Sequence, residues 1–321
     1  MKASFFKLPL IFTLAYALIS VVLSFMYTGL MRDEIDVSFM FDNIIFSVFY
    51  YSIPEYLWMI FISALALNRC HAYCASSKNI ITLIAVALVV VVVIYLFYQF
   101  VAAALFESMA TYNAYYFFDL TYLSYRIITD SALYIISGLM TYFGILSLQQ
   151  TLDKEDTGFT RWTEQSNKIH LILFMVLFTF ACCAILILFT VSIPDMYFFG
   201  DNVTIFTYFV VMIIIAAVVF LLIKNRFTHR FNSLQTDRIV KCAVLCVILT
   251  TLVSIVIMIA TLFLIFIGFF DSYEIINFHF FEIIHVILFV SIVLQVMCSV
   301  WIIRAITAKY FAIPYNSSTV Y

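Results

Sequence analysis

Charge is what this sequence lacks most. Only 11% of its 321 residues are Asp, Glu, Lys or Arg, and 66% are hydrophobic, whereas roughly a quarter of the residues in a soluble domain are charged. A water-soluble fold of this length could not bury so many apolar side chains, because its surface would have to be apolar too. The composition therefore excludes a soluble protein and predicts one embedded in lipid.

Glycine and proline are also scarce, with six and four copies. Their scarcity favours long unbroken helices over short strands joined by turns. A transmembrane β-barrel would alternate apolar and polar residues along strands of about ten residues, but residues 80–93 are apolar without alternation. The sequence therefore predicts an all-α integral membrane protein.

A membrane-spanning helix needs about 20 mostly apolar residues. Pro54 is expected to kink the second of the candidate segments, because proline removes a backbone hydrogen bond. No loop is long enough to form a soluble domain, so we predict one transmembrane domain over residues 1–321. An alternative is that this domain consists of two four-helix halves, 1–150 and 151–321. The eight candidate segments are 8–31, 39–67, 80–106, 117–148, 169–193, 203–223, 242–270 and 280–303.

The basic residues predict the orientation of these segments. Apart from Arg32 and Arg126, every Lys and Arg falls before the first segment, after the last, or in every second loop. Cytoplasmic loops are enriched in Lys and Arg, so both termini are predicted to be cytoplasmic. Lys2 and Lys7 before an apolar run also resemble a signal peptide. Its cleavage would leave seven helices, as in a chemosensory receptor, but the run is long for a signal core.

Other signals limit the possible functions. The net charge of −2 indicates no nucleic-acid partner, and the seven cysteines lie in predicted helices or cytoplasmic loops, which argues against a disulfide framework. The sequence contains no phosphate-binding loop, dinucleotide fingerprint or hydrolase motif. We therefore expect no enzyme activity and no cofactor. The short loops favour the cytoplasmic membrane of a bacterium.

Four charged residues in the predicted spans are candidate binding residues. A charge near the bilayer centre costs at least about 2.5–3.5 kcal/mol. Glu55 falls near the middle of the second segment. It is either a protonated carboxyl group that is hydrogen-bonded to another helix, or a binding site for a proton or small cation. Arg126 and Asp130 are four residues apart and can pair on one helix face, with Asp119 on roughly the same side. That pair is either structural or lines a polar vestibule.

A weaker candidate, for a metal site, lies at the start of the last segment. His279, Glu282 and His285 are three residues apart, and Glu-x-x-His is the spacing used by di-metal sites in helix bundles. Such sites need a second motif and further carboxylates, which the sequence lacks. A polar helix end is therefore the simpler interpretation, and a metal site the weaker one.

Polar residues gather in the outer halves of the second, fourth and eighth segments, and Glu55 lies deeper in the second. The outer group is Asp42, Asn43, Asp119, Arg126, Asp130, His279, Glu282 and His285. If these helices are neighbours, they form an acidic pocket that opens outward and ends near Glu55. The leading hypothesis is a small transporter, channel-like or ligand-binding protein that uses protons or a small cation.

Three other functions remain open. The first is an accessory or toxin-protective protein that binds another membrane protein, and the others are a metal-dependent intramembrane enzyme and a chemosensory receptor. Membrane lipids are expected partners, since the basic loop at residues 224–241 attracts anionic head groups.

Overall fold

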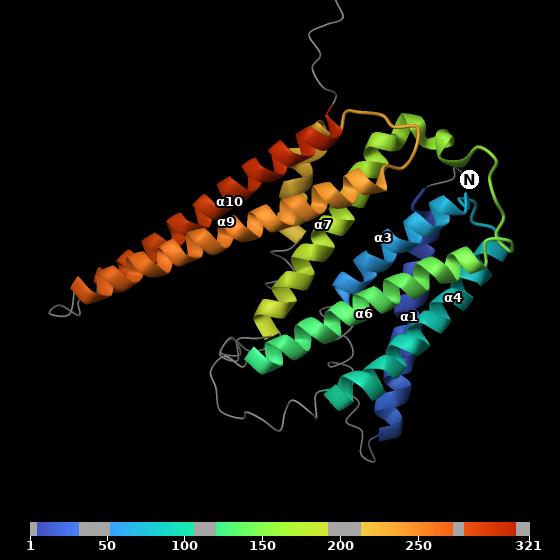
Figure 1. Cartoon of the computed structure of the whole chain (residues 1–321), viewed down its shortest axis with the longest axis horizontal. Coiled ribbons are helices and arrows are strands. Elements are labelled where there is room, and N and C mark those ends of the chain that lie inside the picture. Colours follow the sequence, from blue (N-terminus) through green and yellow to red (C-terminus); the bar gives the residue numbers. More distant parts are fainter. Residues whose placement is uncertain (1–4, 32–51, 106–119, 192–212, 272–278, 313–321) are drawn as a thin grey trace, which may run out of the picture. The chain divides into compact units, whose positions relative to one another are not determined.

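The computed structural model describes residues 5–31, 52–105, 120–191, 213–271 and 279–312 (Figure 1). All regular elements in these ranges are helices, which confirms the predicted all-α class. Residues 213–223 are helical as well. The long helices are α1 (Lys7–Met31), α3 (Ile53–Arg69), α4 (Ser77–Leu96), α6 (Leu120–Ser147), α7 (Ser166–Val191), α9 (Thr236–Asp271) and α10 (His279–Phe311). The short ones are η2 (Phe97–Ala102), η3 (Gly158–Gln165) and η5 (Lys224–Arg226).

Six helical stretches in the described part are long and apolar enough to cross a membrane. They correspond to the first, third, fourth, fifth, seventh and eighth predicted segments. The second and sixth segments, 39–67 and 203–223, lie partly outside the described residues. The chain thus has the helical, apolar character of a multi-pass membrane protein. The six stretches are Lys7–Met26, Ser77–Leu105, Ile127–Ser147, Gly158–Ile185, Thr236–Phe266 and Val286–Phe311.

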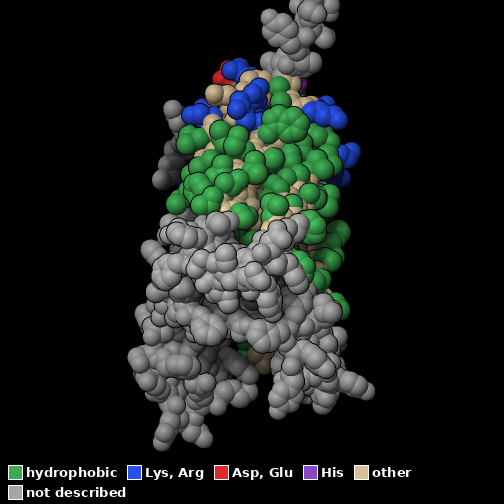
Figure 2. All heavy atoms as spheres, turned by 90° about the vertical axis from the view of Figure 1, so that its left-hand side faces the viewer, with side chains coloured by type: hydrophobic (Ala, Val, Ile, Leu, Met, Phe, Trp, Pro, Cys, Tyr) green, Lys and Arg blue, Asp and Glu red, His purple; other side chains and the backbone are tan. Residues whose placement is uncertain are grey.

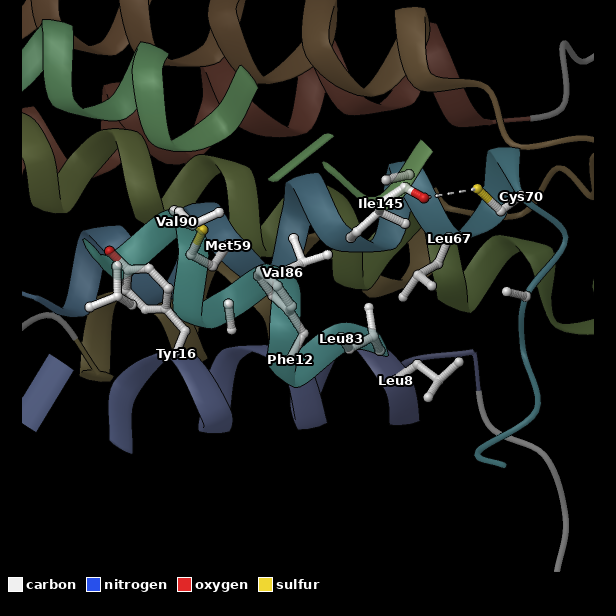
Figure 3. Close-up of a cluster of buried hydrophobic side chains, with 14 of the residues drawn as sticks. Leu8, Phe12, Tyr16, Met59, Leu67, Cys70, Leu83, Val86, Val90 and Ile145 are labelled. Atoms are coloured by element: carbon white, nitrogen blue, oxygen red, sulfur yellow. Dashed lines mark hydrogen bonds between the residues drawn. The ribbon is translucent and has the colours of Figure 1, made fainter. Parts of the chain in front are cut away.

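The chain forms two compact units. The first comprises Met1–Ile214 and Arg230–Thr236, and the second Ile215–His229 and Asp237–Tyr321. In the first unit α3 packs against α1, α6 and α7, and α4 packs against α1 and α6. The helices enclose a row of buried side chains that runs from Leu8 to Tyr16 along α1 (Figure 3). Helix α3 is therefore at the centre of this unit.

The outer surface of the helices is apolar. In α4 and η2, Ile81, Val89 and Phe100 are 67%, 55% and 71% exposed. Figure 2 shows hydrophobic side chains over most of the described surface on one face, with Lys and Arg side chains gathered at its border. Contact with lipid accounts for such a surface, because hydrocarbon does not penalise exposed apolar groups.

In the first unit the basic ends of the helices are joined by two packed connections, residues 70–76 and 148–165. Asn79 is fully buried, and its amide nitrogen donates to the carbonyls of Cys74 (2.8 Å) and Asp153 (3.2 Å). Its Oδ1 accepts the Asp153 N–H at 2.7 Å. The Glu155 N–H also donates to the His71 carbonyl (2.9 Å). The distribution of Lys and Arg predicts that these two connections lie on the same side of the membrane, and in the structure they are in contact.

Aromatic side chains close this end of the unit. The Phe5 ring lies 5.9, 6.0 and 6.3 Å from the rings of Tyr73, Phe159 and Trp162. Phe159 and Trp162 belong to η3, so part of the connection predicted as a plain loop is a buried element. Burial raises the pKa of Tyr73 to about 12. The Tyr73 hydroxyl therefore stays protonated at neutral pH and donates to Asn68 Oδ1 (2.8 Å).

A strap of residues 230–236 is bound to the start of α7. The Phe231 N–H donates to Ser166 Oγ (2.8 Å), and the Gln235 N–H donates to His170 Nε2 (3.0 Å). Nε2 is thus the acceptor, so the proton is on Nδ1, which lies 2.6 Å from the Ser166 carbonyl. The fully buried imidazole is neutral and anchors non-helical backbone to a helix end.

Replacing Asn79 with Ala should lower the free energy of unfolding by about 1–3 kcal/mol, because buried backbone groups lose their partners. Thermal unfolding in detergent, followed by tryptophan fluorescence, measures the effect. Thr82→Ala in the same helix is the control, since its hydroxyl donates to the Lys78 carbonyl of its own helix (2.9 Å). Equal melting temperatures for the two variants would contradict the role assigned to Asn79.

Candidate functional site

Glu55 lies in the first turn of α3, which begins at Ile53 after the N-cap Ser52. Pro54 occupies the same turn, where its missing N–H is not needed and its fixed φ suits a helix start. In the described part Glu55 therefore lies in a first turn and not near the middle of a helix, and the kink expected at Pro54 depends on residues before Ser52, which lie outside the described part. The positive end of the helix dipole lies beside Glu55 and stabilises its negative charge.

This helix start lies far from the basic ends of α1 and α3. At about 1.5 Å per residue, Glu55 is about 21 Å along α3 from Arg69, and Tyr16 is about 14 Å along α1 from Lys7. The hydrocarbon core of a bilayer is about 30 Å thick. Where Arg69 and Lys7 mark the edge of this layer, both side chains fall inside it.

Glu55 has a hydrogen-bond partner on a second helix. The Tyr16 hydroxyl donates to Glu55 Oε1. Tyr16 is only 1% exposed, and its ring makes an edge contact with that of Tyr56 at 6.4 Å. Tyr16 is therefore held rigidly, and its hydroxyl replaces one of the water contacts that a carboxyl group loses in hydrocarbon.

A second carboxyl group comes from a third helix. Asp130 of α6 is an electrostatic neighbour of Glu55, and α3 and α6 have an extensive interface. A neighbouring negative charge disfavours ionisation of a carboxyl group, which favours a bound proton or cation. The arrangement of Tyr16, Glu55 and Asp130, hereafter the carboxyl site, therefore has the chemistry of a proton or small-cation site.

The helices that form the carboxyl site are held together by aromatic contacts. The Trp58 indole Nε1 donates to the Tyr134 carbonyl (2.8 Å), which joins α3 to α6. The Phe180 ring of α7 stacks on Trp58 at 5.0 Å and meets the Tyr134 ring edge-on at 5.1 Å. Gly138 makes room for the indole, because a Cβ there would lie 2.8 Å from Trp58 Nε1. The spacing of α3 and α6 thus depends on this glycine.

Other residues predicted for the site fall outside the described part. Asp119 is not described, and neither is the Arg126 side chain, so the Arg126–Asp130 pair stays a prediction. The same holds for the side chains of His279, Glu282 and His285 in the first turns of α10. Among the side chains that are described, no group of three His, Cys, Asp or Glu residues is placed to hold a metal ion. All seven cysteines are free thiols, as expected.

Part of the predicted helix arrangement can be examined. The acidic pocket requires the second, fourth and eighth segments to be neighbours. Helices α3 and α6, from the second and fourth, are packed together. Helix α10, from the eighth, belongs to the other unit, so its contribution to a pocket stays a prediction.

Tyr16 was not predicted as a site residue. It lies in an apolar segment that also contains other aromatic side chains, and tyrosine in such a segment is usually a packing or interfacial residue. The sequence contains no pattern that links Tyr16 to Glu55, because the two are 39 positions apart and meet only through helix packing.

Replacing Gly138 with Ala should destabilise the first unit by about 1–3 kcal/mol, because the added methyl group displaces the Trp58 indole. Thermal unfolding and the Trp58 fluorescence maximum both report this change. Gly144→Ala is the matched control: its Cβ would lie 3.0 Å from one atom, Val86 Cγ1, whereas a Cβ at Gly138 would lie within 3.1 Å of three Trp58 ring atoms. A smaller loss at Gly138 than at Gly144 would refute the spacing argument.

The chain was also compared with known proteins. No known protein family, curated protein or solved structure matches it. Its function has to be inferred from the chemistry of its own residues.

Proposed function

We propose that this chain is a small transporter or channel-like protein of the cell membrane, in which Glu55 binds a proton or a small cation. The observation that supports the proposal most strongly is the carboxyl site. It joins a carboxyl group at membrane depth, a buried tyrosine hydroxyl bonded to it and a second carboxyl group, from three different helices.

A purely structural role for Glu55 explains this arrangement less well. One protonated carboxyl group bonded to a neighbouring helix satisfies its own polar groups and needs no second acid nearby. A second acid that acts electrostatically on Glu55 raises the cost of the Glu55 charge in a low dielectric, and a bound proton or cation lowers that cost. Intramembrane carboxyl groups are costly and are usually functional.

The start of α3 supports the same function. Helices that begin inside the membrane place their positive dipole ends and free N–H groups at substrate sites in many transporters. The N-cap Ser52 and Pro54 begin α3 beside Glu55. In this proposal Arg126 and Asp119 complete the polar surface around Asp130, and Arg126 is the gate or substrate contact.

We further propose eight membrane spans with both termini in the cytoplasm, and the cytoplasmic membrane of a bacterium as the location. Connections 70–76 and 148–165 pack against each other, so they lie at the same end of the helices. An even number of spans between them is consistent with this contact. Lys78, Lys154 and Lys168 belong to these connections or to the helix starts beside them.

Reporter fusions test the orientation. Green fluorescent protein fused after Lys154 or Lys241 should fluoresce, and alkaline phosphatase at the same positions should be inactive, because both positions are predicted to be cytoplasmic. Fusions after Asp201 or Asp271 should behave in the opposite way. Active phosphatase at Lys154 would overturn the proposed topology.

Replacing Glu55 with Gln tests the function. The purified protein is reconstituted into liposomes with an internal pH-sensitive dye, and proton, Na⁺ and K⁺ gradients are applied in turn. The wild type should dissipate one of these gradients, and Glu55→Gln should reduce that flux at least tenfold. Tyr16→Phe should keep the flux but shift its pH dependence, because the carboxyl group loses its donor.

Glu164→Gln, which removes an exposed carboxyl group on η3, is the control and should leave the flux unchanged. Flux in Glu55→Gln that is unchanged and independent of pH would count against the proposal. Absence of flux in the wild type, together with a stoichiometric partner that co-purifies, would favour an accessory or toxin-protective protein instead. Elemental analysis of the same sample shows whether a metal is bound.

A further inference from the structure

The second unit contains a rigid joint at the end of α10. The Phe311 carbonyl accepts the N–H groups of Thr228 (3.3 Å) and His229 (3.1 Å). The Phe227 and Phe311 rings stack 4.3 Å apart at an interplanar angle of 18°, and both side chains are buried. The joint fixes η5 against the last turn of α10, although the two segments are far apart in the sequence.

The joint brings together cationic side chains from both segments. Lys224 and Arg226 lie in η5, immediately before the joint, and Lys224 is exposed. Arg304 is exposed and precedes Phe311 by two helical turns, so it lies on the same face of α10. We call Lys224, Arg226 and Arg304 the basic corner.

The basic corner carries no compensating negative charge nearby in sequence. Residues 213–230 and 286–312 contain no Asp or Glu. None of the three cations forms an ion pair with any residue in the described ranges. Their charges are therefore available to an external anion.

The basic corner lies next to an exposed apolar surface, which indicates that the corner is at the edge of the hydrocarbon layer. Leu221 is 57% exposed three residues before Lys224, and Trp301 is 73% exposed three residues before Arg304. Exposed tryptophan is typical of the zone where head groups meet acyl chains. The cations therefore lie at the level of lipid phosphates, directly above a surface that suits acyl chains.

We propose that the basic corner is a binding site for one anionic phospholipid, whose phosphodiester group contacts Lys224, Arg226 and Arg304. The site is discrete, because the joint holds cations from two chain segments in a fixed arrangement. A fork-shaped guanidinium can form two parallel hydrogen bonds with a phosphate. Exposed Leu221 and Trp301 then contact the acyl chains. The proposal does not depend on transport by the first unit.

The test measures binding of phosphatidylglycerol to the delipidated full-length protein in detergent by native mass spectrometry, with phosphatidylcholine as the neutral comparison. The wild type should bind one phosphatidylglycerol in preference to phosphatidylcholine. The double variant Lys224→Gln/Arg304→Gln should raise the dissociation constant at least tenfold. Both replaced side chains are exposed, so the fold should survive; circular dichroism and gel filtration confirm it.

The double variant Lys154→Gln/Lys168→Gln is the matched control, since it removes two exposed cations from the basic end of the first unit. It should change the dissociation constant less than twofold. Equal weakening in the two double variants would mean diffuse charge attraction and would overturn the proposal. So would displacement of the lipid by low millimolar inorganic phosphate, which would show a simple anion site without acyl-chain contacts.

A further variant separates geometry from charge. Phe311→Ala keeps all three cations but removes the ring that fixes η5 to α10. It should also weaken phosphatidylglycerol binding at least threefold in protein that remains folded and monodisperse. Unchanged binding in this variant would contradict the claim that the joint builds the site.

Discussion

Hydrocarbon offers no hydrogen-bond partners, and the structure follows from that constraint. Each backbone N–H and carbonyl in the apolar layer has to be satisfied within the chain, which a helix achieves by itself. Polar side chains in the layer need partners as well. The Thr13, Ser20 and Thr261 hydroxyls donate to the carbonyl four residues earlier. The Glu55 carboxyl group is satisfied differently, since it accepts a hydrogen bond from the Tyr16 hydroxyl on another helix.

The same constraint explains where irregular backbone occurs. In the first unit the described connections lie at the basic ends of the helices, and buried side chains satisfy much of their backbone. Asn79 bonds one connection to another, and Ser166 and His170 hold the strap of residues 230–236. In the second unit the Phe311 carbonyl accepts the N–H groups of Thr228 and His229, which follow η5. Polar side chains at these ends thus decide how the chain turns, whereas apolar side chains decide how the helices pack.

Much of the fold was predictable because hydrophobicity is a local signal. Helix α1 was predicted over 8–31 and spans Lys7–Met31, and α6 was predicted over 117–148 and spans Leu120–Ser147. Helix α10 continues to Phe311, eight residues past its predicted end, because Ala, Lys and Arg extend a helix after its apolar run stops. Hydropathy detects the most apolar part of a helix and misses a less apolar end.

The carboxyl site was only half predictable for a related reason. Rarity alone drew attention to Glu55 and Asp130, since acids seldom occur in apolar segments. Tyr16 gave no such signal, because its role depends on the helix facing it. The start of α3 was missed because Pro54 suits both a kink and a first turn, and local sequence does not distinguish them. Properties that depend on contacts between helices need coordinates.

The position of Glu55 connects these points. A carboxyl group in the middle of a continuous helix has its neighbouring N–H groups occupied by the helix itself. In the first turn of α3 those N–H groups are not needed for intrahelical bonds, and the helix dipole favours negative charge. The ionised form is therefore less costly there than mid-helix, while Asp130 opposes it. The start of α3 and the neighbouring Asp130 thus act on the Glu55 charge in opposite directions, and both effects arise from where helices begin and how they pack, not from the residues next to Glu55 in the sequence.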